Sequence, residues 1–435
     1  MISRAQEIWQ TDDWLSMVKL TTQPILIWLV AVFIKLPFDI VFAGRLASAL
    51  FGLITALLIA HAAAKFIYPQ AKWFAFFLML VLPFSFFYDR TLLFESTLLT
   101  WMTLAIYIPV AGLPLAILTK QTGWLAVPLA ILLHFRNRKL IIISLLSALL
   151  IPFAVWFIAL GNWEQITKIN FGQTAATLGS ADFKVNVLRA KLWLVSYVTL
   201  PILLLALFGL IKESVESVKK RVLSPALIIG LWSALILIFE AKVAVIFYPR
   251  YLYPMLLGIV LLATSSLWTF FTFVRDIKKP IWRLTALFIS PIILFYPSVR
   301  FDYTLVNSPQ DASLALEDRV QFFEDWTSGV GSNEFNKEIT TFTKSSNQDL
   351  VVYVESENSY FITLDRKNEQ NYSIEIADWL NDPLTEIPQE VFEEKTEVWF
   401  VRSRHPDIPG NWPVSLITRV QKSPSRNVYL YRINK

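Results

Sequence analysis

The chain has 435 residues, of which 55% are hydrophobic and only 17% are charged, and its formal net charge is +5. This composition excludes an ordinary soluble domain and predicts a protein that crosses a membrane several times. The sequence contains no cysteine and only three widely separated histidines, which excludes disulfides, thiolate chemistry and a histidine-rich metal site.

Charge is distributed unevenly along the chain. Residues 1–300 contain 26 Lys/Arg and 12 Asp/Glu, a net charge of +14, whereas residues 301–435 contain 13 and 22, a net charge of −9. Cytoplasmic loops that face anionic lipid headgroups explain the basic part, so we expect a membrane-lipid partner and no nucleic acid. The acidic part predicts a separate domain in another compartment.

The first 38 residues predict an exoplasmic juxtamembrane segment. Residues 1–23 are polar and lack the apolar core of a signal peptide. Residues 24–38 are apolar but too short to span a membrane, and Lys35 and Pro37 interrupt them. We therefore expect an interfacial helix there.

Residues 39–299 predict a transmembrane bundle of about ten membrane segments. Full spans are expected at about 39–66, 72–88, 91–110, 139–161, 192–211, 223–247, 251–274 and 281–299. Two half-length apolar pieces, 112–119 and 123–135, meet at Lys120-Gln121-Thr122-Gly123. Polar backbone at membrane depth is tolerated only inside protein or beside a wet cavity, so this hairpin should point inward. The loop at 162–191 is either a connector or a lid over a substrate.

Loop charges predict the orientation of the bundle. Most basic residues lie in the turns on one side, which the positive-inside rule places in the cytoplasm. The short turns on the other side hold only Arg90, Lys120 and Arg250. About ten crossings then leave both termini outside, which is difficult without an upstream helix. We therefore expect a further transmembrane helix before this sequence.

The three exoplasmic cations predict an anionic ligand, and a lipid phosphate is the obvious one. Lys120 lies beside the N-terminus of a half-helix, where free backbone N–H groups favour phosphate. Arg250 offers a planar fork for phosphate oxygens. Tyr251 and Tyr253 either stack on a sugar ring or belong to the ordinary aromatic belt. The alternative for the cations is snorkelling at helix ends.

Carboxylates lie near these cations. Glu95 falls within an apolar helix, where an ionisable side chain is expensive and is a functional candidate by default, and Asp89 lies at the exoplasmic helix end before it. The alternative for Glu95 is an ion pair that fixes helix packing. Glu240 and Lys242 lie towards the outer end of another helix and point to different faces, so they are secondary candidates.

After residue 300 the pattern becomes that of a water-soluble domain outside the membrane. An amphipathic stretch covers 332–345, and period-2 alternation predicts strands. The predicted strands are 349–354, 397–402, 415–421 and 428–433. The expected fold class is an all-α polytopic membrane helix bundle over 39–299, followed by a small soluble exoplasmic α/β domain over 300–435.

Four short motifs follow one another along the chain. The first motif has two parts, the run from Gln23 to Leu29 and the run from Ala43 to Gly52. The second is the spacing of five residues from Arg90 to Glu95. The third is Leu118-Thr119-Lys120, and the fourth is Arg250-Tyr251-Leu252-x-Pro254. In this order they resemble motifs of the GT-C glycosyltransferases, the class of the protein mannosyltransferases, aminoarabinose transferases and RgtA/B/C/D-like enzymes. The resemblance covers residues 5 to about 300.

The resemblance implies an integral-membrane glycosyltransferase of a prokaryotic cell membrane. It would move a hexose or pentose, with inversion, from a polyprenyl-phosphate-linked donor to a lipid, glycan or protein acceptor at the exoplasmic face. Glu95 and Asp89 are then the expected catalytic carboxylates. The expected ligands of the donor phosphate and sugar are Arg90, Lys120, Arg250 and Tyr251.

The resemblance also implies a catalytic acid in the first exoplasmic loop, whose counterpart would fall before about residue 5. Asp12 and Asp13 are the nearest acids present, but they lie too close to Pro24 for that position. A divalent cation stays open as a cofactor. A transporter or flippase of lipid-linked sugars, an oligosaccharide polymerase or ligase, and a catalytically incomplete membrane protein stay open as alternatives.

Overall fold

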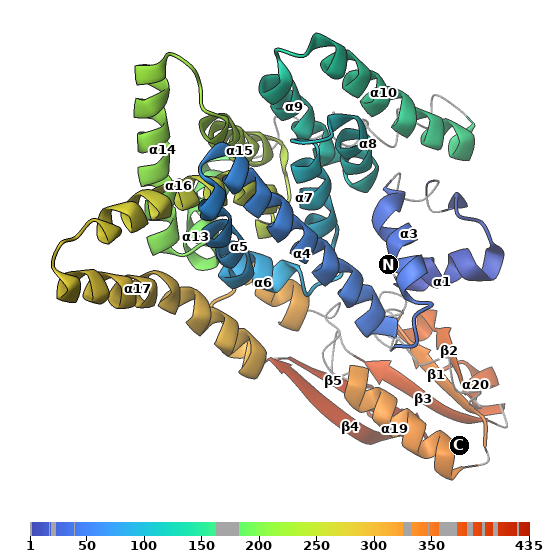
Figure 1. The fold of residues 1–435 in the computed structure, drawn as a ribbon. Coiled ribbons are helices and arrows are strands. Elements are labelled where there is room, and N and C mark those ends of the chain that lie inside the picture. The colour runs from blue at the N-terminus through green and yellow to red at the C-terminus, as the bar shows by residue number, and fades with distance from the viewer. Residues whose placement is uncertain are drawn as a thin grey trace. The chain divides into compact units, whose positions relative to one another are not determined.

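The computed structural model contains two compact units, Met1–Ala315 and Leu316–Lys435. The described residues are 2–16, 18, 23–38, 40–161, 182–324, 332–346, 348–355, 372–380, 386–393, 396–402, 408–423 and 426–435. The first unit is helical and the second contains a sheet (Figure 1). Most of the predicted connector or lid at 162–191 lies outside the described residues.

Two short helices open the first unit, α1 (Ile2–Thr11) and α3 (Pro24–Phe33). Pro24 begins α3 because proline fits the first helical turn, where its missing N–H would have had no partner. The two helices share a buried apolar cluster, and the Trp9 indole N–H donates to the Ala31 carbonyl at 2.7 Å. The predicted short apolar helix is present, and its place at a membrane surface stays a prediction.

Five helices among the described residues are long and apolar enough to cross a membrane. They are α4 (Ile40–Phe66), α10 (Arg138–Leu160), α15 (Pro225–Val243), α16 (Leu256–Arg275) with the preceding η4 (Pro249–Met255), and α17 (Pro280–Asn307). A sixth results if α13 (Phe183–Tyr197) and α14 (Leu200–Lys220), which meet at 108°, count as one span. The shorter helices are η1 (Pro69–Ala71), α5 (Lys72–Val81), α6 (Pro83–Tyr88), α7 (Phe94–Leu104), α8 (Pro109–Thr119), η2 (Gln121–Leu125), α9 (Ala126–His134) and η5 (Pro309–Asp311).

The prediction of about ten membrane segments with uninterrupted full spans was wrong in three places. The expected span at 72–88 breaks at Pro83, the one at 91–110 is reduced to α7, and the one at 192–211 is divided by the bend before Pro201. Pro83 and Pro201 each lie in the first turn of the helix that follows the break, a position that suits proline because its missing N–H would have had no partner there. Apolar composition predicts burial in a membrane but does not locate such breaks.

The predicted pair of half-length helices is confirmed. α8 ends at Thr119 and η2 begins at Gln121, with Lys120 in extended backbone between them. Gly123 allows this hairpin to close, because a Cβ there would lie 2.3 Å from the backbone of Ala116. The hairpin therefore fixes the position of Lys120 at the break between α8 and η2.

The second unit is built on a mixed five-stranded sheet. Its strands are β1 (Leu350–Val354), β2 (Tyr372–Ile376), β3 (Glu397–Arg402), β4 (Val414–Ser423) and β5 (Arg426–Ile433). Their order is β2-β1-β3-β5-β4, with β1 parallel to β2 and β3, and β5 antiparallel to β3 and β4. The other elements are α18 (Leu316–Arg319), η6 (Val320–Glu324), α19 (Ser332–Ser345), η8 (Asp378–Leu380) and α20 (Gln389–Glu393).

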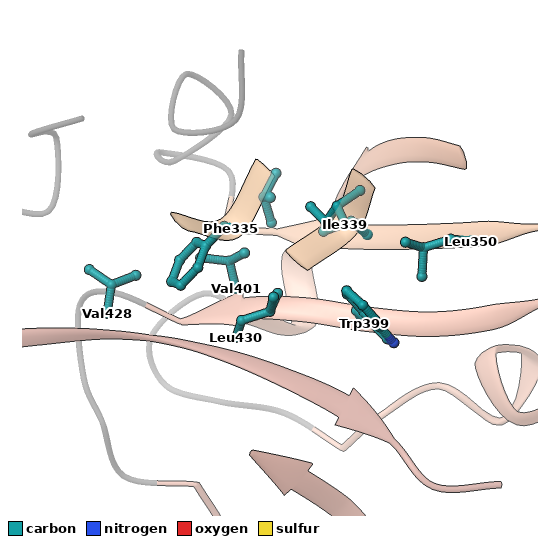
Figure 2. Packing of buried hydrophobic residues seen from close by; sticks show 9 residues of the cluster. Phe335, Ile339, Leu350, Trp399, Val401, Val428 and Leu430 are labelled. Carbon is teal, nitrogen blue, oxygen red and sulfur yellow. The ribbon is translucent and has the colours of Figure 1, made fainter. Parts of the chain in front are cut away.

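Each face of this sheet has its own apolar core. Figure 2 shows Phe335 of α19 beside Val401, and Ile339 of α19 near Leu350 and Trp399 of the sheet. Alternate strand residues such as Val351 point to the other face and pack with η8 and α20. The amphipathic helix, the four predicted strands and the fold class of an α-helical membrane bundle followed by a small α/β domain are confirmed, whereas the exoplasmic side of that domain stays a prediction. The short strand β2 was missed because its side chains are mostly exposed.

Candidate functional site

Glu95 lies in the first turn of α7 and is 2% exposed. A negative side chain is favoured at this end of a helix, where the backbone N–H groups carry positive charge. Glu95 Oε1 accepts a hydrogen bond from Lys120 Nζ at 2.8 Å, so the two form an ion pair. Glu95 Oε2 is buried and has no hydrogen-bond partner among the described residues. One oxygen of this carboxylate therefore neutralises Lys120 and the other is uncommitted.

Lys120 also contacts an aromatic ring from a distant part of the chain. Its ammonium lies 4.7 Å from the ring centroid of Tyr251 in η4. Arg250 precedes Tyr251 in the chain, and its guanidinium lies 4.5 Å from the ring centroid of Tyr248 and 5.8 Å from that of Tyr251. The charge of Arg250 interacts with that of Glu95. The structure thus brings together Glu95, Lys120, Arg250 and Tyr251, four of the predicted site residues.

Glu240, a secondary candidate in the sequence, joins this group. It is 5% exposed near the end of α15, and its charge interacts with those of Lys120 and Glu95. Lys242 is exposed, so the two side chains point to different faces as predicted. We call Glu95, Lys120, Glu240, Arg250 and Tyr251 the Glu95 cluster.

Three side-chain hydrogen bonds fix the position of α15, the helix that carries Glu240. The Trp232 indole N–H donates to the Leu125 carbonyl at 2.7 Å, which ties α15 to η2. The Asn186 side chain of α13 donates to the carbonyls of Ala241 and Ala244 at 3.0 and 2.9 Å. Carbonyls at a helix end have no partner within the helix, so Asn186 fixes the end of α15 next to Glu240.

Asp89 lies in the turn between α6 and α7, beside the Glu95 cluster but not in it. Its Oδ1 accepts hydrogen bonds from Ser96 Oγ at 2.5 Å and from Tyr253 Oη at 2.7 Å. Burial raises the pKa of the Asp89 carboxyl to about 7, against the lowering effect of these two hydrogen bonds. A Cβ on Gly52 would lie 2.2 Å from this carboxyl, so glycine is needed there. Asp89 thus anchors η4, and with it Arg250, to the start of α7.

The remaining predicted residues make other contacts. Arg90 lies with its guanidinium 3.6 Å from the ring centroid of Phe86, and its charge interacts with that of Asp302. Asp13 Oδ1 accepts two backbone N–H bonds within its own turn at 3.0 Å, and Asp12 has a left-handed backbone with φ of 54°. Arg90, Asp12 and Asp13 make none of the contacts described above for the Glu95 cluster.

The Glu95 cluster can bind an anion and hold a carboxylate beside it. Its two cations come from η4 and from the break in the helical hairpin, and its two carboxylates come from α7 and α15. In the described part of the chain, no group of three or more His, Cys, Asp and Glu side chains is arranged to hold a metal ion. The sequence alone could not assign Glu240 or Tyr253, because single polar residues near helix ends are common in membrane proteins.

Comparison with known proteins identifies the fold. No protein-family model matches the chain, and no curated protein matches it. The chain is similar to the crystal structure of ArnT from Cupriavidus metallidurans bound to undecaprenyl phosphate, with a TM-score of 0.62 and 13% identity over 99% of this chain and 92% of that one. The same protein in the apo state gives a TM-score of 0.54 and 14% identity over the same shares. The chain therefore has the fold of these ArnT structures.

Proposed function

We propose that the chain is a membrane glycosyltransferase that moves a sugar from a polyprenyl-phosphate-linked donor to a lipid, glycan or protein acceptor at the exoplasmic face. The observation that carries the proposal is the Glu95 cluster, in which Lys120 and Arg250 both lie near the ring of Tyr251 and Glu95 forms an ion pair with Lys120. The fold shared with an ArnT structure that holds undecaprenyl phosphate supports it.

Lys120 and Arg250 are proposed to bind the donor phosphate. The donor phosphate joins a polyprenol to a sugar, so it is a diester with one negative charge, and an arginine fork with a lysine point charge is a common way to hold it. Bond cleavage between sugar and phosphate leaves additional negative charge on the phosphate, and cations fixed in place stabilise that charge in the transition state. The ring of Tyr251 lies near both cations, 4.7 Å from the Lys120 ammonium and 5.8 Å from the Arg250 guanidinium, so it is proposed to contact the sugar next to the phosphate.

Glu95 is proposed to shape the acceptor side of the site. In an inverting transfer the acceptor hydroxyl attacks from the face opposite the phosphate and gives up its proton to a base. The buried, uncommitted Oε2 of Glu95 can accept a hydrogen bond from that hydroxyl and orient it. In this proposal Glu95 orients the acceptor hydroxyl and does not itself take the proton, and Glu240 adds a second negative charge near Lys120.

The test is sugar transfer by the purified full-length protein in proteoliposomes, with polyprenyl-phosphate-linked sugars as donors. Lys120→Ala and Arg250→Ala should each weaken donor binding, whereas Lys242→Ala, which removes an exposed cation near Glu240, should not. Donor binding that never leads to transfer would favour a lipid-linked sugar transporter or a catalytically incomplete protein. Unchanged donor affinity in both Lys120→Ala and Arg250→Ala would show that these two residues are ordinary cations at helix ends.

A further inference from the structure

A groove of about 170 Å³ lies between α4 and the α5–α6 segment. Its apolar lining comes from all three helices and includes Ala49, Leu53, Ala56, Met79, Leu80 and Phe86. The small side chains on one face of α4 leave the hollow open, since a larger residue at those positions would fill it. Leu53 and Leu80 are 41% and 44% exposed, so the groove opens to the outside of the helical unit.

The groove has a cation at one end. Arg90 also lines it, and the guanidinium lies over the ring of Phe86 at 3.6 Å. Asp302 offsets part of its charge, but the Arg90 side chain stays exposed and can pair with a further anion. Asp89 also lines the groove, but its carboxyl accepts hydrogen bonds from Ser96 and Tyr253. An apolar hollow therefore ends at an accessible arginine.

A lipid is the ligand that matches both features. The helix α4 is long and apolar enough to cross a membrane, so the surroundings of the groove in the cell are lipid chains. A membrane lipid with a negative headgroup can place its chain in the hollow and its phosphate on the guanidinium, which holds phosphate oxygens in a bidentate manner. A lipid with no net headgroup charge fills the hollow equally well but gains less from Arg90.

We infer that this groove is a binding site for an anionic phospholipid, with part of one acyl chain in the hollow and the headgroup phosphate on Arg90. The site is separate from the Glu95 cluster, and only the preference for a phospholipid over the polyprenyl donor rests in part on the proposed function. A straight acyl chain suits so small a groove better than the branched chain of a polyprenyl phosphate. The proposed phosphate ligands of such a donor, Lys120 and Arg250, also lie in the cluster rather than here.

The experiment is native mass spectrometry of the purified full-length protein after incubation with phosphatidylglycerol or phosphatidylcholine of the same acyl composition. We expect phosphatidylglycerol to be retained about fivefold better, the effect of one basic residue on an anionic lipid. Ala49→Phe should block retention of both lipids by filling the groove. Arg90→Gln should remove only the preference. Leu50→Phe is the matched control, since Leu50 is 38% exposed on the same helix and does not line the groove.

Three results would overturn the inference. The first is equal retention of the two lipids by the unaltered protein. The second is equal retention by Ala49→Phe and Leu50→Phe. The third is that a polyprenyl phosphate displaces phosphatidylglycerol equally well from the unaltered protein and from Lys120→Ala. That result would assign the groove to the chain of the polyprenyl phosphate.

Discussion

Lys120 Nζ lies 2.8 Å from Glu95 Oε1, which joins the break in the α8–α9 hairpin to the first turn of α7. Glu95 is almost fully buried, and the Lys120 side chain is 16% exposed. Removing two charges from water usually opposes folding as much as their attraction favours it, so such a pair is weak evidence for a purely structural role. The uncommitted Oε2 of Glu95 and the nearby Arg250 favour a pair kept for ligand binding.

Glu95→Gln tests the role of the carboxylate charge. Glutamine keeps the shape of the side chain and can still accept from Lys120, so the fold should be retained while the charge is lost. We expect sugar transfer to fall at least about tenfold, on the order of 1.4 kcal/mol of transition-state stabilisation. The measurement is the initial transfer rate at equal amounts of folded protein. Full activity in this variant would leave Glu95 as a residue that only fixes helix packing.

Lys120 should matter for both stability and donor binding, and two variants separate these effects. Lys120→Met leaves the Glu95 charge buried without its cation and should destabilise the fold by about 3–5 kcal/mol. The double variant Glu95→Gln/Lys120→Met removes both charges and should recover most of that stability. It should not recover donor binding. Thermal unfolding in detergent and donor titration measure the two effects, and a double variant that binds donor normally would contradict the proposed role of Lys120.

Gly52→Ala should disturb the anchor between η4 and the start of α7. The new Cβ would lie 2.2 Å from the Asp89 carboxyl, which must then move away from Tyr253. We expect a loss of stability of about 1–3 kcal/mol, the usual range for overpacking, together with weaker donor binding because η4 carries Arg250. Gly410→Ala is the control, since nothing lies within 4 Å of a Cβ there. Equal unfolding temperatures for the two variants would show that Asp89 moves freely.

The sequence predicted the cations of the site better than the carboxylates. Lys120 and Arg250 could be found because each is a basic residue in a turn where the positive-inside rule expects few. Glu240 could not be ranked, because nothing in a single helix shows which of its faces meets the hairpin. Arg90 was grouped with the other two by the same charge rule, but its recorded contacts are with Phe86 and Asp302. Charge rules locate residues along the membrane axis and do not show which helices are neighbours.

The second unit contains a buried ion pair, and removing one partner of it should destabilise the unit strongly. Arg402 at the end of β3 donates from Nη1 to Glu355 Oε1 at 2.7 Å and also to the Leu380 carbonyl. Arg402→Ala would leave Glu355 charged and buried, so we expect a loss of about 3–5 kcal/mol. Arg432→Ala breaks a half-exposed pair with Glu397 and should lose less than about 1 kcal/mol. Hydrogen exchange of the β1 and β3 amides in the full-length protein measures both, and similar exchange in the two variants would contradict the ranking.

The proposed exoplasmic location of the second unit can be tested with single cysteines, because the natural chain has none. Lys344 is exposed on α19, and Lys139 is exposed at the start of α10, in a turn that the positive-inside rule places in the cytoplasm. A membrane-impermeant maleimide added to intact cells should label Lys344→Cys and not Lys139→Cys, and opening the membrane should make both reactive. The opposite pattern would invert the topology. It would also place the Glu95 cluster on the cytoplasmic side, where the excess of basic residues would make Lys120 and Arg250 ordinary loop cations.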